Sequence, residues 1–271
     1  MAVLTGFPVE WETKPTTAQG WEYNTGHFGI GGTIDTAPAG GSSASGGSAF
    51  RCAYPPNLDS NGNPIAHPTS IGGGTANYNA LNHPELYMGH WVKWSSNWVW
   101  NSVGSKVNYF WAQNPSTTLG SNAMGTLRIS PRAAGLVMTV DFQLHTPDTG
   151  LVRALDSAPY NFPRNRWCWL ETHLKVNPIG NVWNGICEVW IDGFQLINYR
   201  TCRLVDITGN TIGNFLHSPE WGGGGQPAFA TTMYCWFDHT VISTTPIGIP
   251  GGSVPPPDTT PPSVPTGLAV V

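Results

Sequence analysis

Polar and aromatic residues that suit sugar recognition alternate with apolar residues along one stretch of the chain. They are Glu171, His173, Lys175, Glu188 and Trp190. Successive side chains of a β-strand point to opposite faces, so this spacing predicts one face that carries carboxylate, imidazole, ammonium and indole groups together. Sugars present apolar C–H faces and rings of hydroxyls, which aromatic platforms and hydrogen-bonding groups recognise. The pattern therefore indicates a polysaccharide-binding surface.

The two strands of a β-hairpin must position these residues. They flank a loop rich in Asn and Gly, and the second strand ends in Asp192-Gly193, a dipeptide that favours a tight two-residue turn. We interpret Asp192 as a turn former rather than a ligand. Apolar residues between the polar ones, such as Leu170 and Val189, are then expected to face a core.

A further strand, predicted over 136–145, adds polar residues to the same surface. Asp141 is one of them, and Trp111 at the end of another short strand is a second aromatic candidate. We expect the hollow outer side of one sheet to display four residues next to one another. These are Gln143, His145, His173 and Trp190.

The composition is typical of a loop-rich all-β protein. Hydrophobic residues make up 40% and charged residues only 10%, against about 25% charged in an average soluble domain. No window shows the i, i+3, i+4, i+7 spacing of an amphipathic helix, and roughly ten to fourteen short runs separated by turn signals predict a two-sheet antiparallel sandwich. The 13 tryptophans are too many for a core alone, so we expect exposed platforms in or near loops: Trp98, Trp100, Trp183 and Trp221.

Charge and hydropathy disfavour several partners. The formal net charge is −4 and no basic run occurs, so we predict no nucleic-acid partner. No run reaches the ~18 apolar residues of a membrane span, and the first residues lack the basic and apolar regions of a secretory signal. We still expect an extracellular or virion-surface location, reached after signal removal, through virion assembly or by cell lysis.

Cysteines and acidic loops give little sign of a metal. The five cysteines form no CxxC pair, so zinc is not expected. Cys168 and Cys187 fall on the two hairpin strands and could be cross-strand neighbours, as a disulfide or as buried thiols. The Asp59, Asn61 and Asn63 spacing resembles a calcium loop, but its glycine comes too early, so a plain turn is favoured. We predict no cofactor and no metal site, and leave a structural calcium ion open.

Three stretches resemble the concanavalin A-like jelly-roll superfamily: Leu86–Trp111, Trp167–Gly193 and Trp236–Gly248. The branch they resemble most holds laminin-G-like domains and jelly-roll polysaccharide lyases. The resemblance implies an antiparallel two-sheet jelly roll over residues 1–245. Because this fold hosts lectins, hydrolases, lyases and virion parts alike, the resemblance implies the fold more than the activity.

The lyase branch implies a β-elimination site. Its members carry a Q-x-H tripeptide, which Gln143-Leu144-His145 matches. By that resemblance Gln143 would bind the uronate carboxylate, His145 would be the base, and Tyr109 or Tyr234 would be the acid. The R-x-E-x-R and Y-F-K-A-G-x-Y-N-Q strands of the same family are absent, so lyase activity stays an alternative to binding.

Glycoside hydrolysis is disfavoured. The glucanases of the superfamily use an E-x-D-x-x-E run, which does not occur in this chain. Glu188 and Asp192 would lie about 13 Å apart on a strand that rises 3.3 Å per residue, whereas a retaining pair of carboxylates needs about 5 Å.

The end of the chain differs from the rest in composition. Residues 246–262 are rich in proline and predict a semi-rigid linker, and residues 263–271 resemble the first strand of a fibronectin type III module. We infer the front part of a longer protein. Three functions stay open: polysaccharide recognition, polysaccharide cleavage by a lyase, and a structural surface or decoration protein of a phage particle or filament. The last would have assembly partners or form a homo-oligomer.

Overall fold

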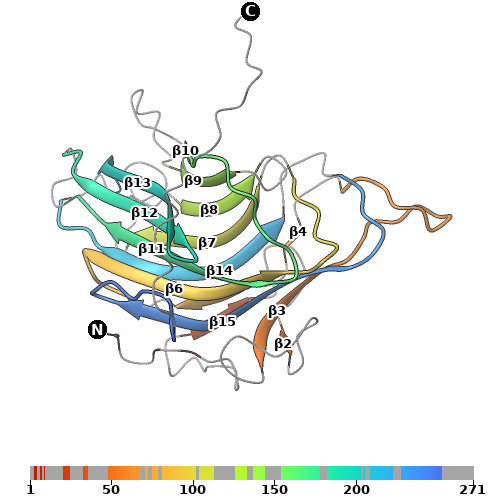
Figure 1. The fold of residues 1–271 in the computed structure, drawn as a ribbon, viewed down its shortest axis with the longest axis horizontal. Helices are drawn as coiled ribbons and strands as arrows, with labels where there is room; N and C mark the ends of the chain where they lie inside the picture. The colour runs from red at the N-terminus through yellow and green to blue at the C-terminus, as the bar shows by residue number, and fades with distance from the viewer. Residues whose placement is uncertain are drawn as a thin grey trace, which may run out of the picture.

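Two stacked antiparallel β-sheets form the protein in the computed structural model (Figure 1). The structure describes residues 3–4, 7, 9, 21–24, 33–35, 48–67, 71–72, 75–78, 81–101, 104–112, 126–132, 137–143, 154–177, 182–202, 204, 208–221 and 227–251. Within these ranges every regular element is a β-strand, and no helix has the length and hydropathy to span a bilayer. The predicted all-β, two-sheet antiparallel fold is confirmed.

The seven-stranded sheet contains the hairpin that the sequence singled out. Its strands in spatial order are β13 (Phe194–Cys202), β12 (Gly185–Ile191), β11 (Trp167–Lys175), β6 (Glu85–Trp94), β15 (Met233–Ser243), β3 (Ala49–Tyr54) and β2 (Thr33–Asp35). β11 and β12 pair with His173 opposite Glu188. β6 pairs with both β11 and β15 and so forms the middle of the sheet.

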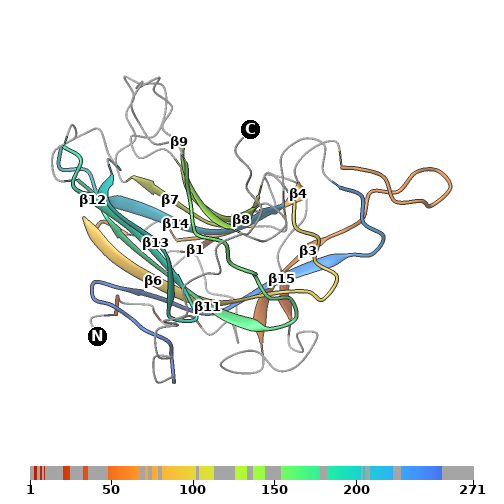
Figure 2. The same cartoon turned by 45° about the horizontal axis from the view of Figure 1, so that its top comes forward.

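The eight-stranded sheet forms the second layer, and Figure 2 shows its strands β8 and β9 to be strongly curved. Its strands in spatial order are β1 (Trp21–Asn24), β5 (Thr75–Tyr78), β14 (Ile212–Trp221), β7 (Ser105–Ala112), β8 (Thr126–Arg132), β9 (Val137–Gln143) and β10 (Ala154–Asp156), with β4 (Ile71–Gly72) beside β14.

β14 is a strand that the sequence pattern did not predict. Trp221 at its end was expected in or near a loop, and Pro219 within it normally argues against an inner strand. The register between β14 and β7 shifts between His217 and Glu220. This irregularity spans Pro219, so the ladder accommodates a residue that has no N–H to donate.

Side chains alternate between core and outer face along β6. The buried set is Leu86, Met88, His90, Val92 and Trp94. Fully burying a large apolar side chain stabilises a fold by about 1.5–3 kcal/mol, so this alternation fixes which face of the sheet packs inward.

The hairpin turn after β12 forms as predicted. Asp192 and Gly193 have φ values of 49° and 80°, the left-handed conformation that a tight two-residue turn requires. The Asp192 Oδ1 atom accepts the Trp169 N–H at 2.8 Å, and Oδ2 lies 2.8 Å from Arg166 Nη2. Asp192 is therefore a turn former that also ties β11 to its neighbour.

All five cysteines are buried as free thiols. The register pairs Cys187 with Leu174 and Cys168 with Val92, so the expectation that Cys168 and Cys187 are cross-strand neighbours is wrong. Burial raises the pKa of Cys168 to about 12, which disfavours the reactive thiolate. These residues act as small apolar core residues.

Two histidines meet in the core between the sheets. His90 of β6 and His217 of β14 contact edge to face with 4.9 Å between ring centroids, and His217 Nε2 lies 2.8 Å from Thr240 Oγ1. Neither ring nitrogen of His90 has a hydrogen-bond partner among the described residues. Burial lowers the pKa of His90 to about 3 and also holds the pKa of His217 well below its ordinary value. Both rings are therefore neutral in the folded protein near neutral pH.

This burial predicts a loss of stability in mild acid. The unfolded chain protonates position 90 near pH 6.5, whereas the folded protein does so only near pH 3. The free energy of unfolding therefore falls as pH drops through this window, with a slope of up to about 1.4 kcal/mol per pH unit from this group. His90→Phe keeps a ring but takes up no proton, so we expect a shallower slope in urea denaturation across that range. If the free energy of unfolding falls with pH equally steeply in the variant and in the parent protein, this account is wrong.

Candidate functional site

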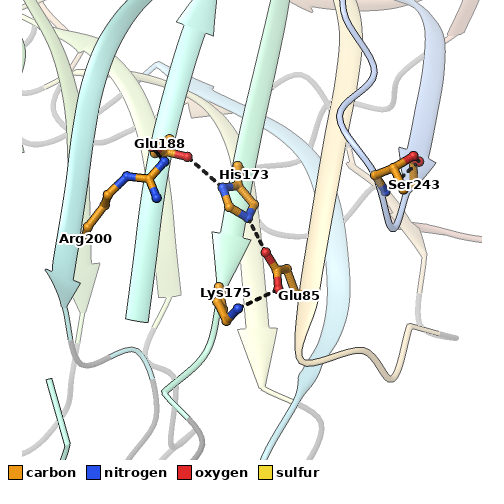
Figure 3. A network of polar contacts seen from close by, with 7 residues as sticks. Glu85, His173, Lys175, Glu188, Arg200 and Ser243 are labelled. Atoms are coloured by element: carbon orange, nitrogen blue, oxygen red, sulfur yellow. Dashed lines mark hydrogen bonds and ion pairs between the residues drawn. The ribbon is translucent and has the colours of Figure 1, made fainter. Parts of the chain in front are cut away.

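Five charged or ionisable side chains form a continuous chain across the outer face of the seven-stranded sheet (Figure 3). This charge chain runs Arg200–Glu188–His173–Glu85–Lys175. His173 Nδ1 lies 2.7 Å from Glu188 Oε2, and His173 Nε2 lies 2.9 Å from Glu85 Oε1. A neutral imidazole carries one N–H, so both contacts are hydrogen bonds only when the three groups share an additional proton.

Tyr87 and Glu85 of β6 fix one side of the charge chain. The Tyr87 ring stacks on the His173 ring with 4.1 Å between centroids and 1° between planes. Burial raises the pKa of Tyr87, and the charges of Glu85 and Glu188 raise it further, so the phenol keeps its proton. At Glu85 partial burial acts to raise the pKa, but hydrogen bonds and charge from Lys175 and His173 outweigh it and hold this pKa below its usual value.

The residues that follow β15 turn back over this face as a strap (residues 246–249), which Glu171 ties down. Glu171 Oε1 accepts the Ile247 N–H at 3.0 Å, and Oε2 accepts the Gly248 N–H at 3.0 Å and the Trp169 Nε1–H at 3.4 Å. Gly248 has a φ of 72°, a conformation that favours glycine. The packed domain therefore continues past the boundary at 245 that the sequence suggested, into the first residues of the predicted linker.

Trp169 forms the floor beneath the strap. It is 1% exposed, and its ring contacts that of Trp91 edge to face at 5.4 Å between centroids. A Cβ atom at Gly89 would lie 2.2 Å from Cζ2 of Trp169. The indole thus covers the β6 backbone at a point where only glycine leaves room.

The floor, the strap and part of the charge chain surround a pocket of about 360 Å³. Besides the strap, its main lining residues are Tyr87, Trp169, Glu171, Glu188, Trp190 and Arg200. Trp190 is half-buried and Arg200 is exposed. The arrangement can hold a small ring compound between aromatic walls, with a cationic group at the edge.

The structure brings together five of the predicted sugar-binding residues on one outer face: Glu171, His173, Lys175, Glu188 and Trp190. Their environment differs from the expected solvated surface, since Glu171, His173 and Glu188 are only 8%, 3% and 2% exposed. Their polar atoms bind one another and the strap. Contact with a ligand would therefore depend more on Trp190 and on the neighbouring Tyr87 and Arg200.

The expected display of four residues on a single face is wrong. Gln143 lies in β9 of the eight-stranded sheet, whereas His173 and Trp190 lie in the seven-stranded sheet. Trp111, in β7, also belongs to the eight-stranded sheet, and His145 lies outside the described residues. Alternation along a strand predicts its two faces but not the sheet it joins.

The residues predicted for a lyase are divided as well. Tyr109 pairs with Arg128, and Arg128 pairs with Asp141, so these positions form one row across β7, β8 and β9. Gln143 follows Asp141 by two residues in β9. Tyr234, the other predicted acid, lies in β15 of the seven-stranded sheet and cannot serve a site built on β9.

Most of the loop tryptophans expected as exposed platforms are core residues. Trp98, Trp100 and Trp221 are 2%, 7% and 0% exposed. Trp100 packs edge to face on Trp94 with 5.1 Å between centroids. Only Trp183 among the four is exposed, at 40%.

The loop that resembled a calcium site is closed by its own hydrogen bonds. Asp59 Oδ1 accepts the N–H groups of Asn61 and Asn63 at 2.9 and 2.8 Å, and Oδ2 accepts Asn63 Nδ2–H at 3.2 Å. This is the favoured turn interpretation. Among the described residues no group of three or more His, Cys, Asp or Glu side chains could hold a metal ion.

Three contributors to the pocket were not predicted as site residues: Tyr87, Arg200 and the strap. Alternation along β6 placed Tyr87 opposite the core-facing Leu86, so a signal for its outward direction existed. Arg200 is brought to Glu188 by the pairing of β12 with β13, which contains two register shifts. The return of the strap rests on hydrogen bonds to Glu171, 76 and 77 residues earlier, and no local pattern encodes it.

Comparison with known proteins finds similarity in structure only. No family model and no curated protein matches the chain. An endo-β-1,4-glucuronan lyase from the fungus Trichoderma reesei aligns with a TM-score of 0.58 at 13% identity, over 79% of this chain and 87% of that chain. The cellulose-induced protein Cip1 aligns at 0.55 and 14%, over 90% and 99%. A PL-14 alginate lyase from Aplysia kurodai aligns at 0.54 and 15%, over 82% and 86%. At these identities the likeness shows a shared jelly-roll fold.

The tight contact at Gly89 predicts that a single methyl group disturbs the pocket floor. Gly89→Ala should lower the free energy of unfolding by about 1–3 kcal/mol, because overpacking forces the indole or the β6 backbone to move. Chemical denaturation measures this change. In the Trp169→Leu background the same substitution should cost clearly less, since the clashing ring atoms are gone. An equal cost in both backgrounds would show that the strain arises elsewhere.

Proposed function

We propose that this jelly-roll domain binds a polysaccharide and seats one sugar ring against Trp190. The observation that carries the proposal is the half-buried Trp190 in a pocket of about 360 Å³ whose other walls include Tyr87 and the strap. Small-molecule sites usually measure about 300–1,000 Å³ and combine aromatic walls with a few polar groups. An indole ring suits the apolar C–H face of a pyranose.

Contacts within the protein hold the pocket residues in place. Glu171 fixes the strap and the Trp169 ring, and Glu188 is held between His173 and Arg200. Binding then requires little ordering of side chains, which lowers its entropic cost. Sharing a fold with glucuronan and alginate lyases supports a polysaccharide as the ligand class. An extracellular or virion-surface location is part of this proposal.

Two tryptophan variants test the proposed binding mode. Trp190→Ala should weaken polysaccharide binding about tenfold or more, because an aromatic contact contributes roughly 1–2 kcal/mol. Affinity electrophoresis against a panel of polysaccharide gels, followed by calorimetry, measures the loss. Trp183→Ala removes an equal but exposed indole outside the pocket and should leave binding nearly unchanged. If the parent protein binds no polysaccharide, the proposed function is refuted. If only Trp183→Ala loses binding, the site lies at Trp183 instead of Trp190.

A second candidate function is β-elimination on a uronate polysaccharide, at the eight-stranded sheet. It is favoured by the placement of Gln143 in the same sheet as the row Tyr109, Arg128 and Asp141. In this reaction a base removes the proton beside the uronate carboxylate, a C=C bond forms, and the glycosidic C–O bond breaks as an acid protonates the leaving oxygen. The proposal assigns carboxylate binding to Gln143, proton removal to His145 and oxygen protonation to Tyr109.

A pair of tyrosine variants tests the lyase candidate. Cleavage of glucuronan or alginate would raise ultraviolet absorbance through the new unsaturated ends. Tyr109→Phe should slow that increase at least about 100-fold, the usual contribution of a general acid. Tyr234→Phe removes the same hydroxyl from the other sheet and should leave the rate unchanged. No absorbance change with any uronate polysaccharide would remove this candidate.

A further inference from the structure

We infer that the pocket on the seven-stranded sheet selects an acidic sugar, with the ring on Trp190 and the acid group on Arg200. This inference rests on the proposed polysaccharide binding and specifies its ligand class. The expected unit is a pyranose that carries a carboxylate or a sulfate ester.

Arg200 has the donors that such a group needs. Its side chain is 61% exposed at the pocket edge, and one nitrogen, Nη2, contacts Glu188. A guanidinium has five N–H donors, and no other described residue accepts from this one. The remaining donors form a planar fork, which matches the two oxygens of a carboxylate or sulfate.

The carboxylates of the pocket are already bound by protein groups. Glu188 contacts His173 with one oxygen and Arg200 with the other. Glu171 accepts three N–H groups, from Trp169 and from two strap residues. An incoming anion therefore meets carboxylates that each already accept protein donors, and a guanidinium that still has donors available.

Tyr87 supplies a second polar contact. Its ring is held against His173, and its hydroxyl has no hydrogen-bond partner among the described residues that surround the pocket. A phenol can donate to or accept from a sugar hydroxyl. With Trp190, Arg200 and Tyr87 together, the pocket offers one apolar surface, one cationic fork and one neutral polar group, which a single acidic sugar unit can use at once.

Matched oligosaccharides test this selection. Cellohexaose and a glucuronan hexamer share a β-1,4 backbone and differ at C6, where one has a hydroxymethyl group and the other a carboxylate. Mannohexaose and a β-1,4-mannuronan hexamer form a second such pair, and sulfated cellohexaose separates sulfate from carboxylate as the acid group. Isothermal titration calorimetry at low ionic strength is expected to show at least one acidic member binding about tenfold or more tightly than its neutral partner.

Variants at Arg200 assign the preference to its side chain. Arg200→Gln should abolish the difference in affinity between the acidic and the neutral member of a pair. Arg200→Lys keeps a positive charge beside Glu188 and so controls for a loss of folding. It should retain only part of the preference for the acidic sugar, because lysine lacks the planar fork of donors. Arg164→Gln removes an exposed charge outside the pocket and should preserve the preference.

The outcomes separate this inference from the function on which it rests. Equal affinity for the acidic and neutral members of both pairs, or a preference that persists in Arg200→Gln, overturns acid selection while polysaccharide binding stands. Failure of the parent protein to bind any oligosaccharide or polysaccharide overturns both.

Discussion

One buried carboxylate holds the candidate site together. Glu171 lies in β11, between β12 and β6, and accepts hydrogen bonds from the Trp169 indole and from two amides of the strap. Charge-assisted hydrogen bonds are strong where water is excluded, and a buried donor left unpaired costs about 1–3 kcal/mol. Glu171 therefore links the pocket floor to the strap, and departure of the strap would remove two of the three hydrogen bonds that this carboxylate accepts.

Within the charge chain, contacts between opposite charges offset the cost of burying His173 and Glu188. Burying an unpaired ion is costly, and each carboxylate in this chain contacts two groups that carry or can carry positive charge. Replacing a buried ion pair by apolar residues is often neutral or stabilising. We therefore infer that the charge chain sets the geometry of the site rather than adding net stability. It fixes Glu188 and the stacked Tyr87 ring in one arrangement, and so fixes the edge of the pocket where Arg200 lies.

Local periodicity in the sequence predicted most of the fold. The features that it missed depend on pairing between residues far apart in the chain. Alternation along the hairpin strands correctly predicted that Leu170 and Val189 face the core, and Asp192-Gly193 correctly predicted a turn because its conformation is a local property. The same alternation grouped Gln143 with His173, although β9 and β11 belong to different sheets. It also could not anticipate that Glu171 is buried, since the covering strap comes from 76 residues later.

His173 and Glu171 position the pocket on the seven-stranded sheet and have no polar atom left over for proton transfer. On the seven-stranded face His173 has both ring nitrogens engaged by carboxylates, and Glu171 has both oxygens engaged by N–H groups, so neither offers a free site for proton transfer to a ligand. A general base needs such a site within hydrogen-bond reach of the substrate. On this face Glu171 and His173 therefore serve to position the pocket, and the proposed β-elimination would have to use residues of the eight-stranded sheet.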